Sequence, residues 1–219
     1  MRCFSVERIP LVKSLLGSAQ PPTDIQEHRV RWRARLQLQD DALLVVGVGR
    51  LTAQKNFGRF IEAVVLANQQ QPVYAVIAGP DMGLGDTPQQ QIQAAGLDPA
   101  AIRLIGPVED ALELICAADI FLLSSDYEGM PNVVLEAMVV GILCVCTQVN
   151  GIDTLIEPGV HGFITTHSPE ALAKPMLWLA ADPILRNQIG QNARMRIEVE
   201  FDPALAFQKL LQFCEHGYE

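Results

Sequence analysis

Short apolar runs and amphipathic stretches alternate along most of the chain. A continuous apolar run predicts a strand that is buried on both faces, whereas a half-exposed strand shows alternating polarity. The clearest run of this kind lies at residues 43–48, and further strands are predicted at residues 73–78, 102–105, 120–123, 143–147 and 163–165. The hydrophobic pattern therefore predicts a series of strands within a sheet that is covered on both faces.

The segments between these strands have the periodicity of amphipathic helices. We place helices at residues 57–68, 88–95, 110–117 and 131–140. Strands that alternate with helices predict right-handed crossovers and a parallel sheet covered on both faces. The fold class is therefore α/β, a Rossmann-like doubly wound parallel sheet. After Gly151 the pattern changes, and further helices are predicted at residues 153–156, 169–181, 183–198 and 203–215.

The N-terminal segment differs from the rest of the chain. Residues 10–23 are predicted to be an irregular linker, and residues 27–38 a short basic helix. We expect residues 1–28 to be a linker or the remnant of a preceding domain. Residues 29–219 are then a single Rossmann-like domain with additional C-terminal helices, a reasonable size for one folding unit.

Composition favours a well-packed globular protein. Apolar residues make up 49% and charged residues 19% of the chain, which excludes disordered and coiled-coil classes. No stretch reaches the roughly 18 consecutive apolar residues of a membrane-spanning helix, so we expect no integral membrane segment. The five cysteines are odd in number and lack metal-binding or redox spacing. They predict reduced thiols and a cytoplasmic location.

Charge is distributed unevenly. The chain carries a formal net charge of −9, and the excess of acidic residues lies after residue 40. An acidic domain is a poor general partner for nucleic acid. Residues 104–173 contain no Lys or Arg, whereas Arg50, Lys55 and Arg59 lie close together in the sequence. This local group of cations predicts a specific anion site.

Two loops at the predicted carboxyl ends of strands carry candidate chemistry, because ligands bind at that edge of an open parallel sheet. In the first loop, residues 49–56, Gly49 permits close backbone approach, and Arg50 and Lys55 suit a diphosphate. The spacing matches neither a P-loop nor a GxGxxG loop. A pair of solvated basic residues on a surface loop is therefore an equally open interpretation.

The second loop, residues 124–131, leads into a helix that is apolar on nearly every side. Glu136 is the only charged residue between Gly129 and Ile152. A carboxylate in such a helix costs free energy unless it is hydrogen-bonded. Glu136 therefore pairs with a structural partner, faces solvent through a gap in the packing, or accepts hydrogen bonds from ligand hydroxyls.

The two loops together resemble a known family. GRLTAQKN at residues 49–56 and EGMPNVVLEAM at residues 128–138 are similar to the donor-binding half of a GT-B-fold retaining glycosyltransferase, of the group 1 or family 4 type. The pair Glu128 and Glu136 is that family's signature. The resemblance covers roughly residues 29–219 and implies transfer of a sugar from a nucleotide diphosphate sugar to an acceptor, with retention and without a metal.

The resemblance also implies roles for individual residues. Arg50 and Lys55 match the family's pair that neutralises the diphosphate, and Glu128 matches the glutamate that contacts the donor sugar; these three are the expected catalytic residues. Glu136 matches the glutamate that binds the ribose, and Val108 lies where the family holds the base. The other expected donor-binding residues are Gly49, Gly129, Met130, Asn132 and Val133. No cofactor is implied beyond a UDP- or GDP-type donor substrate.

A GT-B enzyme has two Rossmann-like domains, and about 28 residues before the matched region are too few for the first. We expect a truncated gene product, a separately encoded half or an excised domain. Its partners would be a nucleotide-sugar donor, a glycan, lipid or small-molecule acceptor, and a separate N-terminal domain that could bring it to the inner face of the membrane. A nucleotide-sugar-binding module or inactive pseudoenzyme remains an alternative, as does a plain α/β scaffold.

Overall fold

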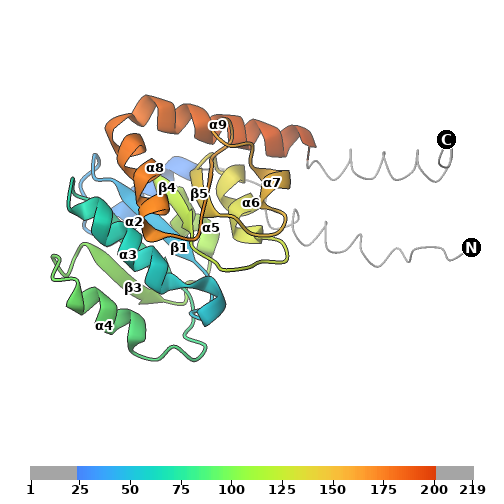
Figure 1. Ribbon diagram of the computed structural model, residues 1–219. Helices are drawn as coiled ribbons and strands as arrows, with labels where there is room; N and C mark the ends of the chain where they lie inside the picture. Colours follow the sequence, from blue (N-terminus) through green and yellow to red (C-terminus); the bar gives the residue numbers. More distant parts are fainter. Residues whose placement is uncertain (1–23, 201–219) are drawn as a thin grey trace, which may run out of the picture.

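A six-stranded parallel sheet forms the centre of the computed structural model, which describes residues 24–200 (Figure 1). The strands, in chain order, are β1 (Leu44–Val48), β2 (Tyr74–Ala78), β3 (Ile102–Gly106), β4 (Ile120–Leu123), β5 (Leu143–Thr147) and β6 (Phe163–Thr165). Each lies within about one residue of its predicted position. The predicted linker at residues 10–23 and the predicted helix at residues 203–215 lie outside the described residues.

The strand order is β3-β2-β1-β4-β5-β6, with every neighbouring pair parallel. The chain starts in the middle of the sheet, builds outward to β3, and then returns to the other side of β1 to begin β4. This is the doubly wound order of Rossmann-like folds, so the predicted fold class is confirmed. The order reverses between β1 and β4, and ligands of such sheets bind outside that point.

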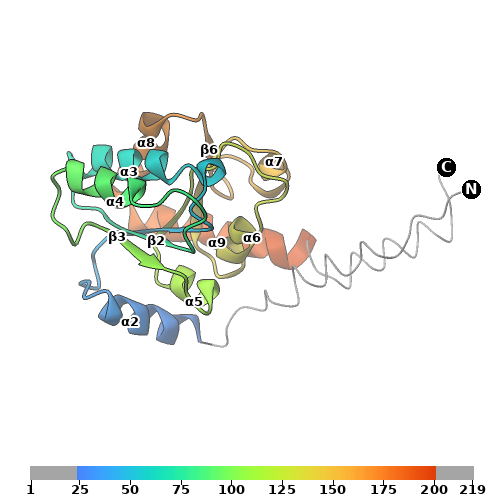
Figure 2. The same ribbon diagram turned by 90° about the horizontal axis from the view of Figure 1, so that it is seen from below.

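Helices cover both faces of the sheet (Figure 2). Helices α3, α4 and α8 lie on one face, and α2, α5 and α6 lie on the other. The helix bounds are α2 (Ile25–Arg35), α3 (Phe57–Asn68), α4 (Thr87–Ala94), α5 (Ala111–Cys116), α6 (Asn132–Val139), α7 (Ile152–Leu155), α8 (Pro169–Ala181) and α9 (Pro183–Glu200). Helix α9 packs against α6, α8 and β5.

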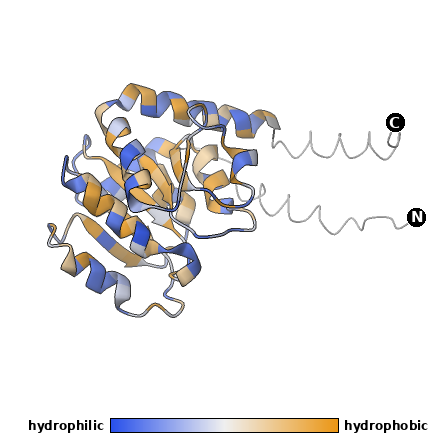
Figure 3. Cartoon of the chain, in the orientation of Figure 1, coloured by the Kyte–Doolittle hydropathy of each residue, from blue (hydrophilic) through white to orange (hydrophobic). Residues whose placement is uncertain are grey.

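Alternate residues of each central strand belong to two separate hydrophobic clusters. In β1, Leu44 and Val46 pack with the α2, α5 and α6 layer, and Val45 packs with the α3 and α8 layer. All three are completely buried. Figure 3 shows the same arrangement, with apolar strands at the centre and polar residues on the outer helix faces. Burial on both faces explains why the strands appear as continuous apolar runs in the sequence.

Helix boundaries differ from their predicted positions where a cap determines them. Helix α2 begins two residues before the predicted start, because the Asp24 side chain accepts a hydrogen bond from the Glu27 N–H at 2.8 Å. Pro131 occupies the N-cap position of α6 with non-helical dihedral angles, φ of −81° and ψ of 77°, so the helix begins at Asn132 rather than at the proline. Among the described helices, none is long and apolar enough to cross a membrane.

A buried carboxylate fastens the N-terminal helix to the rest of the domain. Asp119, immediately before β4, pairs with Arg29 at 2.7 Å and with Arg33 at 3.3 Å, both on α2. Arg186 of α9 lies 3.8 Å from the same carboxylate, and the Leu44 N–H donates to it at 2.8 Å. The Asp119 side chain is only 8% exposed. One acidic residue thus connects α2, β1 and α9.

Three cysteines of the described part are buried free thiols, namely Cys116, Cys144 and Cys146. Burial raises the pKa of Cys116 to about 12, and it raises the pKa of the other two thiols as well. Since the thiolate is the reactive form, we expect iodoacetamide to leave these three unmodified in the folded protein and to modify them in guanidinium. Peptide mapping by mass spectrometry measures this. Rapid labelling of Cys144 in the folded protein would contradict the packing described.

Gly79 is the point of closest approach between the ends of β1 and β2. A Cβ at this position would lie 1.9 Å from the carbonyl oxygen of Gly49, and the Gly79 φ is +149°. We expect Gly79→Ala to lower the free energy of unfolding by about 1–3 kcal/mol, since strain and backbone overlap add together. Gly85→Ala is the matched control, because Gly85 also has positive φ but open space around it. Equal losses in urea denaturation would contradict this explanation.

Candidate functional site

The loop after β1 carries the first predicted anion-binding residues. It begins at Gly49, where a Cβ would lie 3.0 Å from Lys55 Cε, so glycine leaves room for the lysine side chain. The short helix η2 (Ala53–Lys55) follows. Asn56 then ends the loop with φ of 45°, and its side-chain oxygen accepts from the Arg59 N–H at 3.1 Å. This cap fixes where the loop meets α3.

Hydrogen bonds join this loop to the loop that follows β4. Ser124 Oγ donates to the Lys55 carbonyl at 2.9 Å, and the Asp126 N–H donates to the Gln54 carbonyl at 2.8 Å. Arg59 donates to the Ser124 carbonyl at 2.7 Å and pairs with Asp126 at 2.6 Å. Arg59 therefore holds the two loops together. Its grouping with Arg50 and Lys55 in the sequence does not make it part of the same anion site.

Two of the predicted catalytic residues contact each other directly. Lys55 Nζ lies 2.7 Å from Glu128 Oε1, and the two side chains are 15% and 8% exposed. Ser125 Oγ donates to the same carboxylate oxygen at 2.6 Å, and Gln54 Nε2 lies 3.4 Å from the other oxygen. These donors hold the Glu128 carboxylate in one orientation at the carboxyl edge of the sheet. The sequence placed both residues near a ligand but did not predict this ion pair.

Arg50 is the third predicted catalytic residue, and its environment differs from that of Lys55. The Arg50 side chain is exposed, directly after the carboxyl end of β1. Within residues 24–200 it makes no ion pair and no side-chain hydrogen bond. A guanidinium in this position has all of its donors available for an anionic ligand.

Glu136 lies on α6, half-buried among apolar neighbours. In the described part of the chain its carboxylate has no hydrogen-bond or ion-pair partner. Burial raises the Glu136 pKa, and the negative charge of Asp110 adds to this effect. Of the interpretations left open by the sequence, pairing with a structural partner is therefore not observed within the described residues. Both carboxylate oxygens are free to accept hydrogen bonds from a ligand.

The predicted donor-binding residues at the start of α6 surround the helix N-terminus. Gly129, Met130 and Asn132 are exposed, and Val133 is half-buried. The Asn132 N–H donates to the Met130 carbonyl at 3.0 Å. This hydrogen bond spans Pro131, whose φ of −81° and ψ of 77° form a tight turn before the helix. The donor-binding roles of these residues stay predictions.

Val108 lines a separate cavity of about 540 Å³ between α2 and the start of α5. The cavity also contains Trp32 and Arg35 from α2, with the Arg35 guanidinium 4.7 Å from the Trp32 ring centroid. Asp110 lies in the same cavity wall, and its charge is the one that acts on Glu136. Sequence reasoning missed Asp110, because only the fold brings the start of α5 close to α6.

No group of three His, Cys, Asp or Glu side chains in residues 24–200 is placed to hold a metal ion. The groups predicted to bind an anion at this edge of the sheet are the side chains of Arg50 and Lys55. The absence of a metal requirement remains a prediction.

The fold and this loop arrangement define a Rossmann-like α/β domain with its candidate site at the β1/β4 switch point. Residues 28–196 match the family described as glycosyl transferases group 1. The chain therefore belongs to this family, which confirms the resemblance found in the sequence.

Relatives and solved structures agree with this assignment. The amylovoran biosynthesis glycosyltransferase AmsK of Erwinia amylovora is 32% identical over 195 residues, covering 82% of this chain and 47% of AmsK. Anabaena Alr3699/HepE, solved with UDP-glucose, is 25% identical with a TM-score of 0.69, covering 97% of this chain and 53% of HepE. The C-terminal domain of the group 1 protein LpcC from Francisella tularensis has the same fold, with 23% identity, a TM-score of 0.71, and coverage of 84% and 96%. The chain spans about half the length of the curated relatives it matches.

Proposed function

We propose that this chain is the nucleotide-sugar-binding half of a group 1 glycosyltransferase. The observation that carries the proposal is the convergence of the β1 and β4 loops at the switch point of the sheet. There Lys55 and Glu128 meet at 2.7 Å, and the helix that follows carries Glu136 with no partner among the described residues. A paired lysine, an exposed arginine and a free carboxylate suit a ligand that has a diphosphate and several hydroxyls.

The proposed roles follow the chemistry of each group. Arg50 and Lys55 stabilise the negative charge that develops on the departing nucleoside diphosphate, which can replace a metal in that role. Glu128, held by Lys55 and Ser125, accepts hydrogen bonds from the donor sugar. Glu136 accepts hydrogen bonds from the ribose hydroxyls. Val108, which lines the neighbouring cavity, lies where the base of the nucleotide would be held. Retention at the anomeric carbon rests on the family resemblance.

The donor is proposed to be a UDP- or GDP-type sugar, and the acceptor a glycan, a lipid or a small molecule. HepE has been solved in complex with UDP-glucose, and the AmsK name refers to polysaccharide biosynthesis, which supports both proposals. We further propose that residues 29–219 form the donor domain and that residues 1–28 connect it to an acceptor-binding domain. The assembled enzyme would act in the cytoplasm, at the inner face of the membrane.

Calorimetric titration with UDP, GDP and ADP, each beside a sugar conjugate, tests the proposal. We expect one nucleotide to bind and the Glu136→Ala variant to lose most of that binding. Glu62→Ala is the matched control, since Glu62 is exposed on α3, away from the site loops. Absence of binding by all six compounds would contradict donor binding by this chain. Release of the sugar from a bound conjugate would indicate an enzyme, whereas binding without release would indicate a binding module.

A further inference from the structure

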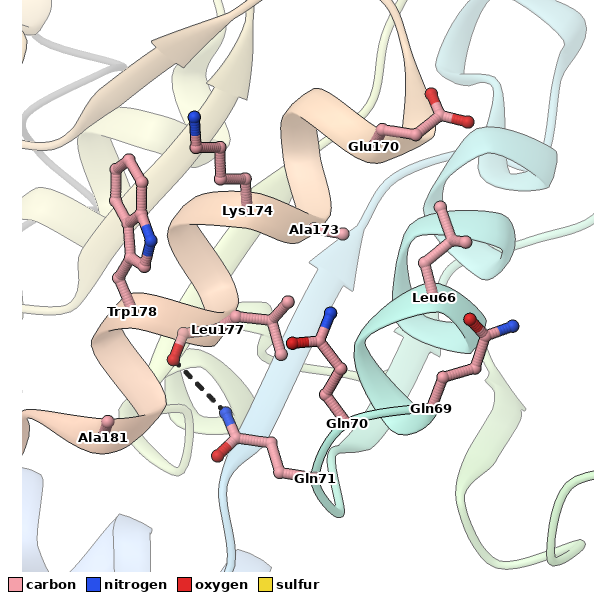
Figure 4. Close-up of a pocket in the computed structure, with 10 residues that line it drawn as sticks. All are labelled: Leu66, Gln69, Gln70, Gln71, Glu170, Ala173, Lys174, Leu177, Trp178 and Ala181. Carbon is pink, nitrogen blue, oxygen red and sulfur yellow. Dashed lines mark hydrogen bonds between the residues drawn. The ribbon is translucent and has the colours of Figure 1, made fainter.

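A second concave surface lies between the C-terminal end of α3 and the length of α8 (Figure 4). This α3–α8 groove has a volume of about 760 Å³, within the usual range for ligand pockets. Its α8 residues extend from Glu170 to Ala181, which corresponds to about 16 Å along the helix axis. The groove is therefore elongated and longer than a single sugar ring.

The groove is separate from the candidate donor site. Helix α3 leaves the carboxyl end of β1, so its far end lies toward the opposite edge of the sheet. Residues 69–71 at that end lead directly into β2. The donor-site loops after β1 and β4 contribute no residue to the groove lining. Whatever binds in the α3–α8 groove therefore does not occupy the switch point.

An exposed indole forms one wall of the groove. Trp178 is 56% exposed, which is unusual for the largest apolar side chain. The Lys174 ammonium lies 5.0 Å from the Trp178 ring centroid, one helical turn away. This cation–π contact holds the lysine over the ring, while more than half of the Trp178 surface stays exposed. Trp178 is thus available as a flat apolar platform.

Polar side chains of the opposite wall are amides rather than charges. Three consecutive glutamines, Gln69, Gln70 and Gln71, follow α3. Gln71 Nε2 donates to the Leu177 carbonyl at 3.3 Å and so connects the two helices, as Figure 4 shows. Gln69 and Gln70 are exposed and make no side-chain hydrogen bond within residues 24–200. Each offers both a donor and an acceptor to a ligand.

We propose that the α3–α8 groove binds a segment of a neutral oligosaccharide. A pyranose has an apolar C–H face that suits an aromatic ring and a rim of hydroxyls that suits planar amides. Glu170 and Lys174 are the charged residues of the lining and cancel each other, which disfavours a polyanion such as nucleic acid. The proposal goes beyond donor binding and does not depend on it. It gives the domain a site that holds a glycan chain away from the reacting sugar.

Tryptophan fluorescence of the full chain tests this proposal with little ambiguity. The chain has two tryptophans, and Trp32 is only 7% exposed, so acrylamide quenching reports mainly on Trp178. The probes are malto-, isomalto-, cello-, manno- and laminari-pentaose, each titrated separately. We expect at least one to protect Trp178 saturably from the quencher. Failure of all five to change the fluorescence would overturn the proposal.

Variants then assign the binding to the groove. We expect Trp178→Ala and Gln70→Ala each to lower the affinity for the pentaose that binds by about fivefold to tenfold, as measured by calorimetry. Gln90→Ala is the matched control, because Gln90 is an exposed glutamine of α4 outside the groove. Unchanged affinity in Trp178→Ala would overturn the proposal. UDP titration of the same variant separates the two sites, since its nucleotide binding is expected to be unaffected.

Discussion

Replacing Glu136 with glutamine is expected to weaken nucleotide binding by about 1–3 kcal/mol, the range for losing a hydrogen bond to a charged group. The same change is expected to stabilise the free protein. In the described part of the chain the carboxylate has no partner, so its burial is a cost that glutamine removes. A residue kept for structural reasons would behave in the opposite way, because its replacement would lower stability and leave ligand binding unchanged.

The pH dependence of stability follows from the raised pKa of Glu136. The folded protein disfavours the ionised carboxylate because of burial and the neighbouring Asp110. The resulting decrease in the free energy of unfolding is absent below the pKa that Glu136 has in the unfolded chain. It is complete above the pKa that Glu136 has in the folded protein. The wild type should therefore lose stability as the pH rises through that window, and Glu136→Gln should lose less. Urea denaturation over a pH series measures both, and parallel profiles for the two proteins would contradict the assignment.

Removal of the Asp119 carboxylate is expected to have the largest effect on stability. Asp119→Ala leaves Arg29, Arg33 and Arg186 without their shared partner, and the Arg33 side chain is only 3% exposed. Breaking a buried ion pair from one side typically costs about 3–5 kcal/mol. We expect a loss of this size in the free energy of unfolding, because α2 and α9 lose their common attachment to the sheet.

Asp126→Ala provides the matched control for this experiment. Asp126 also pairs with an arginine, Arg59, at 2.6 Å, but its side chain is 41% exposed. Solvent-exposed pairs contribute at most about 1 kcal/mol. Denaturation of both variants by urea therefore separates burial from pairing. A smaller loss for Asp119→Ala than for Asp126→Ala would show that the Asp119 cluster does not hold the domain together.

The strands and their order in the chain could be predicted from the sequence because the four central strands, β1, β2, β4 and β5, are buried on both faces. Leu44 and Val45 face different hydrophobic clusters, and both are therefore apolar. This is why β1 appears in the sequence as a continuous apolar run. The helix ends were less certain. The Asp24 side chain caps α2, and Pro131 precedes α6 in a non-helical conformation; the hydrophobic pattern alone distinguishes neither position.

Contacts between distant residues could not be predicted in the same way. Lys55 and Glu128 are separated by 73 positions, and their contact depends on β1 and β4 being neighbours in the sheet. The same holds for Arg59, whose charge looked available in the sequence but is engaged by the β4 loop. The sequence indicated which residue types were present, whereas the topology decided which of them meet.

The cavity beside Val108 and the Asp119 cluster had no local signal either. Both depend on α2, a helix with no clear apolar face, packing against α5 through Trp32 and its arginines. Basic residues at the start of a chain usually predict a solvated surface. Here Arg33 is buried because carbonyl oxygens of the loop before β1 and the Asp119 carboxylate accept hydrogen bonds from its two terminal nitrogens, although its Nε has no partner among the described residues.

The location of nucleotide binding is tested most directly by amide chemical shifts of the labelled chain, recorded with and without the nucleoside diphosphate that binds best among UDP, GDP and ADP. We predict that the largest changes fall at residues 49–56 and 128–136, with smaller ones at residues 106–110. Changes concentrated elsewhere, for example along the α3–α8 groove, would contradict a donor site at the β1/β4 switch point.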